Sequence, residues 1–107
     1  MLRSVEQTRE QTRETRSGEE PRVTELRASV SRLRRELAGY PAEFADRGIA
    51  EDELAAMDAM ALSGVPEVRR LRRSLLLIAG AVGSVSALAA GLANVRHAVE
   101  LFGEPKI

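Results

Sequence analysis

Ser74–Val95 reads SLLLIAGAVGSVSALAAGLANV, and the fold of this chain of 107 residues depends on where this stretch is buried. All 16 Lys and Arg residues and all 16 Asp and Glu residues lie outside it. A helix with no charge on any side must be covered by apolar groups, either in a lipid bilayer or in a protein core. The stretch therefore leaves two interpretations open, a membrane span and the inner part of a helical bundle.

The length of the stretch fits a single span over about residues 75–95, since a bilayer core needs about 20 apolar residues in a helix. Its glycines, serines and Asn94 oppose insertion, and no Trp or Tyr marks either edge. Apolar residues spaced by three and four continue from Val68 to Phe102, with one additional three-residue step at Val85. An apolar face that continues into charged flanks is typical of a bundle helix.

Residues 21–38 are predicted to form a helix with one narrow apolar seam. Pro21 suits the first helical turn, and Gly39 followed by Pro41 is predicted to end the helix. The seam has the alternating spacing of a coiled coil and consists of Val23, Leu26, Val30, Leu33 and Leu37. We expect it to form the core of the bundle and to be an interaction surface.

A second helix is predicted over Glu51–Leu62. Ala50 is expected at its N-cap, and Ile49 is expected to pack against Leu54 as a hydrophobic staple. Gly64 is expected just past its end.

The region Pro66–Phe102 is predicted to be either one long helix or a hairpin that breaks near Gly80–Ser84, with Ser84 capping its second half. The first alternative gives three helices and the second gives four. Both belong to the all-α class, as a small helical bundle over residues 22–107. Residues 1–21 repeat Glu-Gln-Thr-Arg with few apolar side chains, so we expect a disordered low-complexity tail there.

Three stretches carry a resemblance to a family: SRLRREL at 31–37, RGIAEDELAAM at 47–57 and LRRSLLLIAGAVGSVSALA at 71–89. With these stretches, residues 23–57 and 66–105 resemble a family of small uncharacterised actinobacterial proteins. The resemblance implies no activity.

The residues that usually carry catalysis are scarce. The chain has no Cys and one His, His97, and Glu51, Asp52 and Glu53 are adjacent on one helix, where they suit the helix dipole better than a metal ion. Gly80–Ser84 lacks the Lys of a phosphate-binding loop. We expect no enzyme, no cofactor and no metal site.

One cluster of charge is a candidate for an anionic partner: Arg69, Arg70, Arg72 and Arg73. A second basic set is Arg32, Arg34 and Arg35. The first interpretation is that the acidic second helix balances these arginines, within the bundle or between subunits. Anionic lipid headgroups come next, because the cluster adjoins the apolar stretch. Nucleic acid comes last, because the formal net charge is zero and no recognition motif is present.

These observations predict a non-enzymatic helical interaction module that is cytoplasmic and self-associates. Small residues opposite the apolar stripe are expected to pair with a second copy, since monomers rarely expose a large apolar patch: Gly80, Gly83, Ala87 and Gly91. Two alternatives remain open. One is a single-pass inner-membrane protein with a cytoplasmic N-terminal helical region, and the other is an arginine-mediated nucleic-acid binder.

Overall fold

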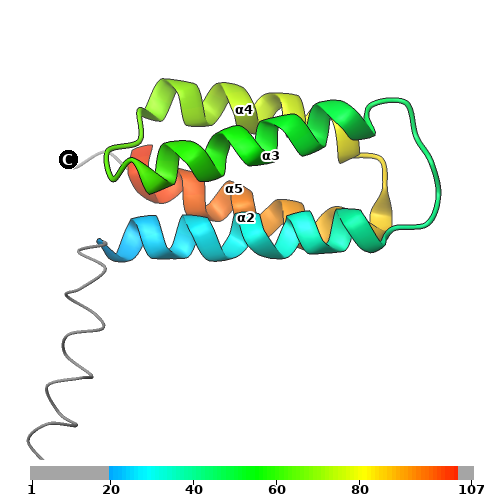
Figure 1. Ribbon diagram of the computed structural model, residues 1–107, viewed down its shortest axis with the longest axis horizontal. Helices are drawn as coiled ribbons and strands as arrows, with labels where there is room; N and C mark the ends of the chain where they lie inside the picture. Colours follow the sequence, from blue (N-terminus) through cyan, green and yellow to red (C-terminus); the bar gives the residue numbers. More distant parts are fainter. Residues whose placement is uncertain (1–19, 104–107) are drawn as a thin grey trace, which may run out of the picture.

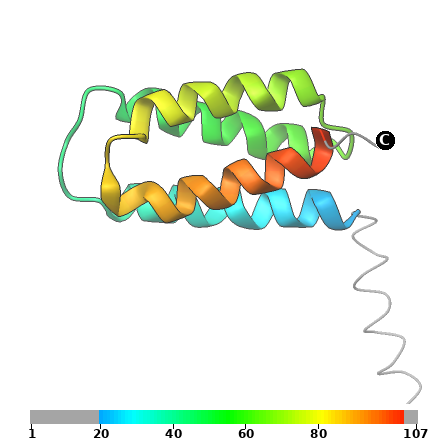
Figure 2. The ribbon, with the colours of Figure 1, turned by 180° about the vertical axis from the view of Figure 1, so that it is seen from behind.

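A computed structural model describes residues 20–103 and shows an antiparallel bundle of α-helices (Figure 1). The elements are α2 (Pro21–Gly39), α3 (Arg47–Leu62), α4 (Val68–Val82), the short 3-10 helix η1 (Ser86–Leu88) and α5 (Ala89–Gly103). Both α2 and α4 pack on α3 and on α5, so the four helices surround one core, as seen from both sides in Figures 1 and 2. The predicted all-α bundle is confirmed in its four-helix form. Up to residue 19, the predicted tail lies outside the described residues.

The uncharged stretch is divided by a turn after α4. Gly83 and Ser84 form the turn, and Val85 is extended, with φ −96° and ψ 98°. The N–H of Gly83 donates to the carbonyl of Ala79 at 2.8 Å, and a Cβ at Gly83 would collide with that same oxygen. Glycine is therefore required here. The hairpin alternative is confirmed, although Val85, not Ser84, precedes the next helical turn.

The two halves of the stretch face the core instead of lipid. Residues 75–95 are shared among α4, η1 and α5. Their large apolar side chains are at most 7% exposed at five positions: Ile78, Val82, Leu88, Leu92 and Val95. None of the helices within residues 20–103 combines the length and apolar composition that crossing a bilayer requires. The single-pass alternative is not favoured.

The seam of α2 is buried inside this bundle. Its five residues, Val23, Leu26, Val30, Leu33 and Leu37, are at most 2% exposed. At the end of α2, Gly39 is still helical, and Tyr40 is extended because Pro41 disfavours a helical backbone at the preceding residue. The expected glycine stop at Gly39 is therefore wrong, whereas Gly64, with φ +85°, follows α3 as predicted.

Helix α3 begins four residues earlier than predicted, at Arg47, with Asp46 as its N-cap. Ala50 lies inside the first turn and is 0% exposed, so its predicted role as a cap is wrong. Ile49 is 45% exposed while Leu54 is fully buried, so the predicted staple does not form.

Arg47 explains the additional turn, because its side chain ties the preceding loop to α3. Its guanidinium donates hydrogen bonds of 2.7 Å to three backbone carbonyls, those of Leu37, Tyr40 and Ala42. It also lies 5.1 Å from the centre of the Phe44 ring, within reach of a cation–π contact. Hydrogen bonds from a charged donor are stronger than neutral ones, and those to Leu37 and Tyr40 are partly buried. The first turn of α3 is thus stabilised by tertiary contacts and not by a capping side chain.

Replacing Arg47 with Met should lower the free energy of unfolding by about 2–3 kcal/mol, because carbonyls that accept from a charged donor lose their partner. Arg35→Met is the matched control, since Arg35 is exposed and donates a hydrogen bond to Ser31 of its own helix. It should change stability by less than about 0.5 kcal/mol. Urea unfolding measures both, and equal losses would contradict the role of Arg47.

Candidate anion-binding surface on α4

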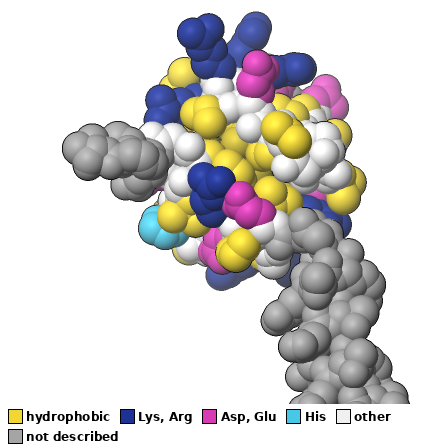
Figure 3. All heavy atoms as spheres, turned by 90° about the vertical axis from the view of Figure 1, so that its left-hand side faces the viewer, with side chains coloured by type: hydrophobic (Ala, Val, Ile, Leu, Met, Phe, Trp, Pro, Cys, Tyr) yellow, Lys and Arg dark blue, Asp and Glu magenta, His cyan; other side chains and the backbone are white. Residues whose placement is uncertain are grey.

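The four clustered arginines are all exposed on the first two turns of α4: Arg69, Arg70, Arg72 and Arg73. The buried face of the helix carries Leu71, Ser74 and Ile78. With 3.6 residues per turn, Arg69 and Arg73 lie opposite that face, and the other two arginines flank them. Figure 3 shows several Lys and Arg side chains gathered at the top of the bundle, on the side of α4.

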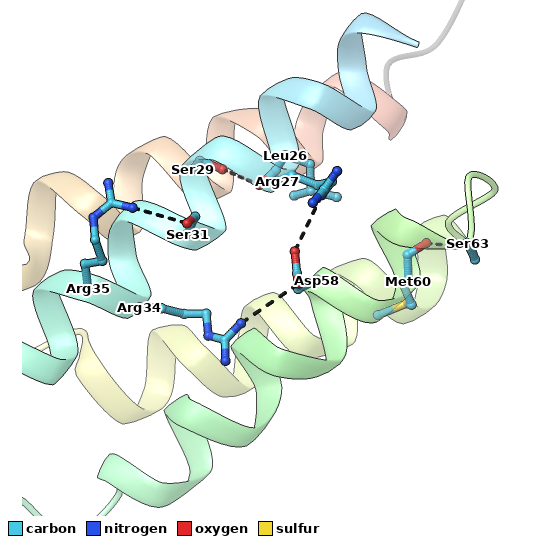
Figure 4. Close-up of polar contacts among 9 residues, drawn as sticks. All are labelled: Leu26, Arg27, Ser29, Ser31, Arg34, Arg35, Asp58, Met60 and Ser63. Atoms are coloured by element: carbon cyan, nitrogen blue, oxygen red, sulfur yellow. Dashed lines mark hydrogen bonds and ion pairs between the residues drawn. The ribbon is translucent and has the colours of Figure 1, made fainter. Parts of the chain in front are cut away.

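No acidic side chain among residues 20–103 forms an ion pair with these arginines. Of the acids of α3, Glu51 and Asp52 are exposed, and the other two contact residues outside the cluster. Asp58 lies between Arg27 and Arg34 of α2, at 3.8 and 3.9 Å (Figure 4), and Glu53 accepts a hydrogen bond from Ser74 at 2.7 Å. Within the described chain, the predicted balance of charge therefore holds for Arg34 and is wrong for the cluster on α4.

Arg72 differs from the other three. Its guanidinium lies beside Gly103, where a Cβ would come within 3.0 Å of the guanidinium carbon. Gly103 is the last residue of α5, and the C-terminal end of a helix attracts cations. Arg72 therefore contacts the end of α5, whereas no hydrogen bond or ion pair within residues 20–103 joins Arg69, Arg70 or Arg73 to another element.

The position of the cluster opposes the stability of α4. Arg69 and Arg70 lie in the first turn, where the unpaired N–H groups carry partial positive charge and cations are disfavoured. Glu67 at the N-cap makes no side-chain cap bond, and α4 contains no acidic residue. The helix dipole therefore does not favour arginines at these two positions.

Exposed large hydrophobic side chains flank the arginines. Leu62 and Val65, which come before them, are 58% and 82% exposed, and Leu76 and Leu77, which follow them, are 72% and 42% exposed. We call these four residues together with Arg69, Arg70 and Arg73 the α4 surface. Sequence reasoning did not assign these hydrophobic residues to a site. Leu76 and Leu77 fall outside the 3-4 spacing of the buried stripe, and this departure from the spacing could have identified them as exposed hydrophobic residues.

The predicted small-residue face does not exist as one surface. Gly80 is exposed on α4, Gly83 lies in the turn and Ala87 is exposed in η1. Gly91 is buried on α5, where a Cβ would approach Leu33 of α2 to 2.9 Å. The prediction that these residues share an open face is wrong, because the turn after α4 separates them and Gly91 is used in packing.

Other titratable groups add little chemistry. Among the described residues, no group of three or more His, Cys, Asp or Glu side chains is placed to hold a metal ion. The hydrogen bond from Arg22 lowers the pKa of the Glu20 carboxyl and raises that of the Arg22 guanidinium. The Arg22 guanidinium also lies 4.9 Å from the ring centre of Phe102. This contact between Arg22 and Phe102 joins the start of α2 to the end of α5.

Arg69→Glu should raise the free energy of unfolding by about 0.5–1.5 kcal/mol at low salt, because it places an anion where the helix dipole favours one. Arg73→Glu, one turn further along, should give a smaller gain because the dipole effect fades beyond the first turn. Salt should reduce both gains. A loss of stability in the Arg69 variant, measured by urea unfolding, would show that this arginine stabilises the bundle.

Comparison with known proteins agrees with the family resemblance. Searches of curated proteins and of solved structures find no match. A family model matches residues 15–103, a range that contains all the helices described above. The chain belongs to DUF5955, a family of unknown function.

Proposed function

We propose that this chain is a non-enzymatic interaction module that binds an anionic partner through the α4 surface. One observation carries the proposal. Arg69, Arg70 and Arg73 have no acidic partner among the described residues, and Arg69 and Arg70 lie in the first turn, where a cation lowers the stability of the helix.

An anionic partner supplies negative charge beside Arg69, Arg70 and Arg73. Opposite charge brought to the α4 surface relieves the repulsion among the arginines and the conflict with the helix dipole. The formal net charge of the chain is zero, so attraction is local to this surface and acts within about 10 Å at moderate salt. Binding is therefore expected to weaken as salt rises.

The proposal includes no catalysis. General acid–base catalysis needs a titratable group held by a partner and placed against a substrate. His97, the single histidine, is exposed on α5. None of the hydrogen bonds or ion pairs described for residues 20–103 involves it.

Heparin, a polyanion with dense charge, should retain the wild-type protein on a column at low salt. The double variant Arg69→Glu/Arg73→Glu should elute earlier, because two of its binding cations are reversed. Arg32→Glu/Arg35→Glu is the matched control, since it changes net charge equally on the outer side of α2. It should elute near the wild type. Equal loss of retention in both variants would show that net charge alone matters and would overturn the proposal.

Self-association is a second candidate function, favoured by one side of η1 and α5. The N-terminal part of this side is exposed, uncharged and made of small residues that permit close approach of a second helix: Ala87, Ala89, Ala90, Ala93 and Asn94. Further along α5, the exposed residues are charged or polar: Arg96, His97 and Glu100. Of the predicted small-residue face, this surface contains Ala87. It does not contain Gly91, which is buried.

Light scattering of protein purified without detergent should then show a dimer. Ala87→Glu should give a monomer with unchanged helix content, because the new charge would be buried at the interface. Ala59→Glu, at an exposed alanine of α3, should remain a dimer. A wild-type monomer would exclude this candidate and leave the α4 proposal intact.

A further inference from the structure

We propose that the anionic partner is the surface of a lipid bilayer with acidic headgroups, and that the protein lies on it with α4 in the plane of the interface. This inference rests on the proposed function and names its partner. It does not involve a span, because no helix among the described residues can cross a bilayer.

The order of side chains along the α4 surface matches such an interface. Val65 precedes the arginines and is the most exposed large hydrophobic residue within 20–103, at 82%, and Leu76 follows them at 72%. Leu76 lies about 10 Å along the helix axis from Arg69, at 1.5 Å per residue. Arginines between two apolar contacts can bind phosphates while the apolar side chains enter the boundary between headgroups and acyl chains.

The location of α4 leaves this surface accessible. α4 is the uppermost element of the bundle from both sides in Figures 1 and 2. Its neighbours α3 and α5 contact it from below and cover its buried face. The outer side of a single straight helix is convex, so it suits a broad surface better than a peptide that needs a groove.

A second copy of the chain fits this surface poorly. α4 carries no acidic residue, and Glu67 at its N-cap is exposed beside the arginines. Pairing two copies through α4 would therefore bring together six outward arginines with one Glu67 from each copy. Like charges placed opposite each other at an interface are strongly unfavourable.

Nucleic acid fits the arginines and leaves the hydrophobic residues unexplained. Binding of single strands uses exposed aromatic rings on which bases stack. The aromatic residues of the described chain lie elsewhere and are partly buried: Tyr40, Phe44 and Phe102. A phosphate backbone offers no apolar contact to Leu76 and Val65. A bilayer with acidic headgroups can contact both the arginines and these hydrophobic side chains.

Vesicles provide the direct test. The full chain should sediment with vesicles of equimolar phosphatidylglycerol and phosphatidylcholine at low salt, and should not sediment with phosphatidylcholine alone. Each basic residue near an acidic membrane strengthens binding by about fivefold, equivalent to about 1 kcal/mol. Arg69→Glu/Arg73→Glu should therefore weaken binding by about 30-fold or more, while Arg32→Glu/Arg35→Glu should bind like the wild type.

The apolar part of the surface is tested by Val65→Ser/Leu76→Ser. Both side chains are exposed, so the fold should be retained, and circular dichroism checks this. Vesicle binding should fall at least tenfold while heparin retention stays unchanged. If the serine variant binds vesicles as well as the wild type, only diffuse electrostatic attraction is present and the inference is overturned.

The remaining outcomes separate the inference from the proposed function. Retention on heparin without binding to acidic vesicles would overturn the lipid partner and leave the anion-binding function standing. If the wild-type protein bound neither heparin nor acidic vesicles, both the anion-binding function and the lipid partner would be overturned. Gel shifts with duplex DNA that require Arg69 and Arg73 but not Val65 and Leu76, together with absent vesicle binding, would assign the surface to nucleic acid instead.

Discussion

The turn between α4 and α5 is the constraint on which the rest of the structure depends. Without it, the uncharged stretch would form one helix, about 33 Å long at 1.5 Å per residue, with too little of the chain to cover it. Gly83 permits the tight approach to the Ala79 carbonyl, and Val85 leaves the helical conformation. The two halves then pack on each other and on α3 and α2, so that one chain covers its own apolar stripes. The turn also explains why the small residues do not form a continuous face.

Polar contacts of Arg47 and Asp58 join α3 to α2 and to the loop between them. These contacts also affect which acidic side chains can reach the arginines of α4. Arg47 binds the carbonyls of the loop between α2 and α3. Asp58 lies between Arg27 and Arg34 and links α3 to α2 (Figure 4). Asp58 is thus directed to α2, and Glu53 accepts a hydrogen bond from Ser74. The arginines of α4 are left without acidic partners among the described residues, which makes their surface the most unusual feature of the bundle.

Such a surface has a consequence for stability. Cations in the first turn of a helix and large exposed hydrophobic side chains both lower the stability or the solubility of a free monomer. Proteins commonly carry such residues where binding needs them, at some loss of stability. The opposing requirements meet on α4, whose inner face packs the core and whose outer face carries Arg69, Arg73 and Leu76. The family match leaves function open, so the physical character of this face is the main guide to it.

The sequence by itself determined the all-α class and the seam of α2, and it marked the place where the apolar stretch could break. Each depends on local properties: apolar spacing shows which residues turn to one side, and an additional step in that spacing, next to glycine, shows where a helix can end. Whether the helix ends there was decided by the tertiary structure. Only the tertiary structure decided the start of α3, the burial of Gly91 and the pairing of the acids. The start of α3 depends on Arg47 reaching carbonyls up to ten residues away. The pairing of Asp58 depends on which helix lies beside α3, and spacing along one helix carries no information about its neighbours. For the same reason, the sequence could identify the arginine cluster but could not show that Asp58 pairs with α2 and that no acid among the described residues pairs with the cluster.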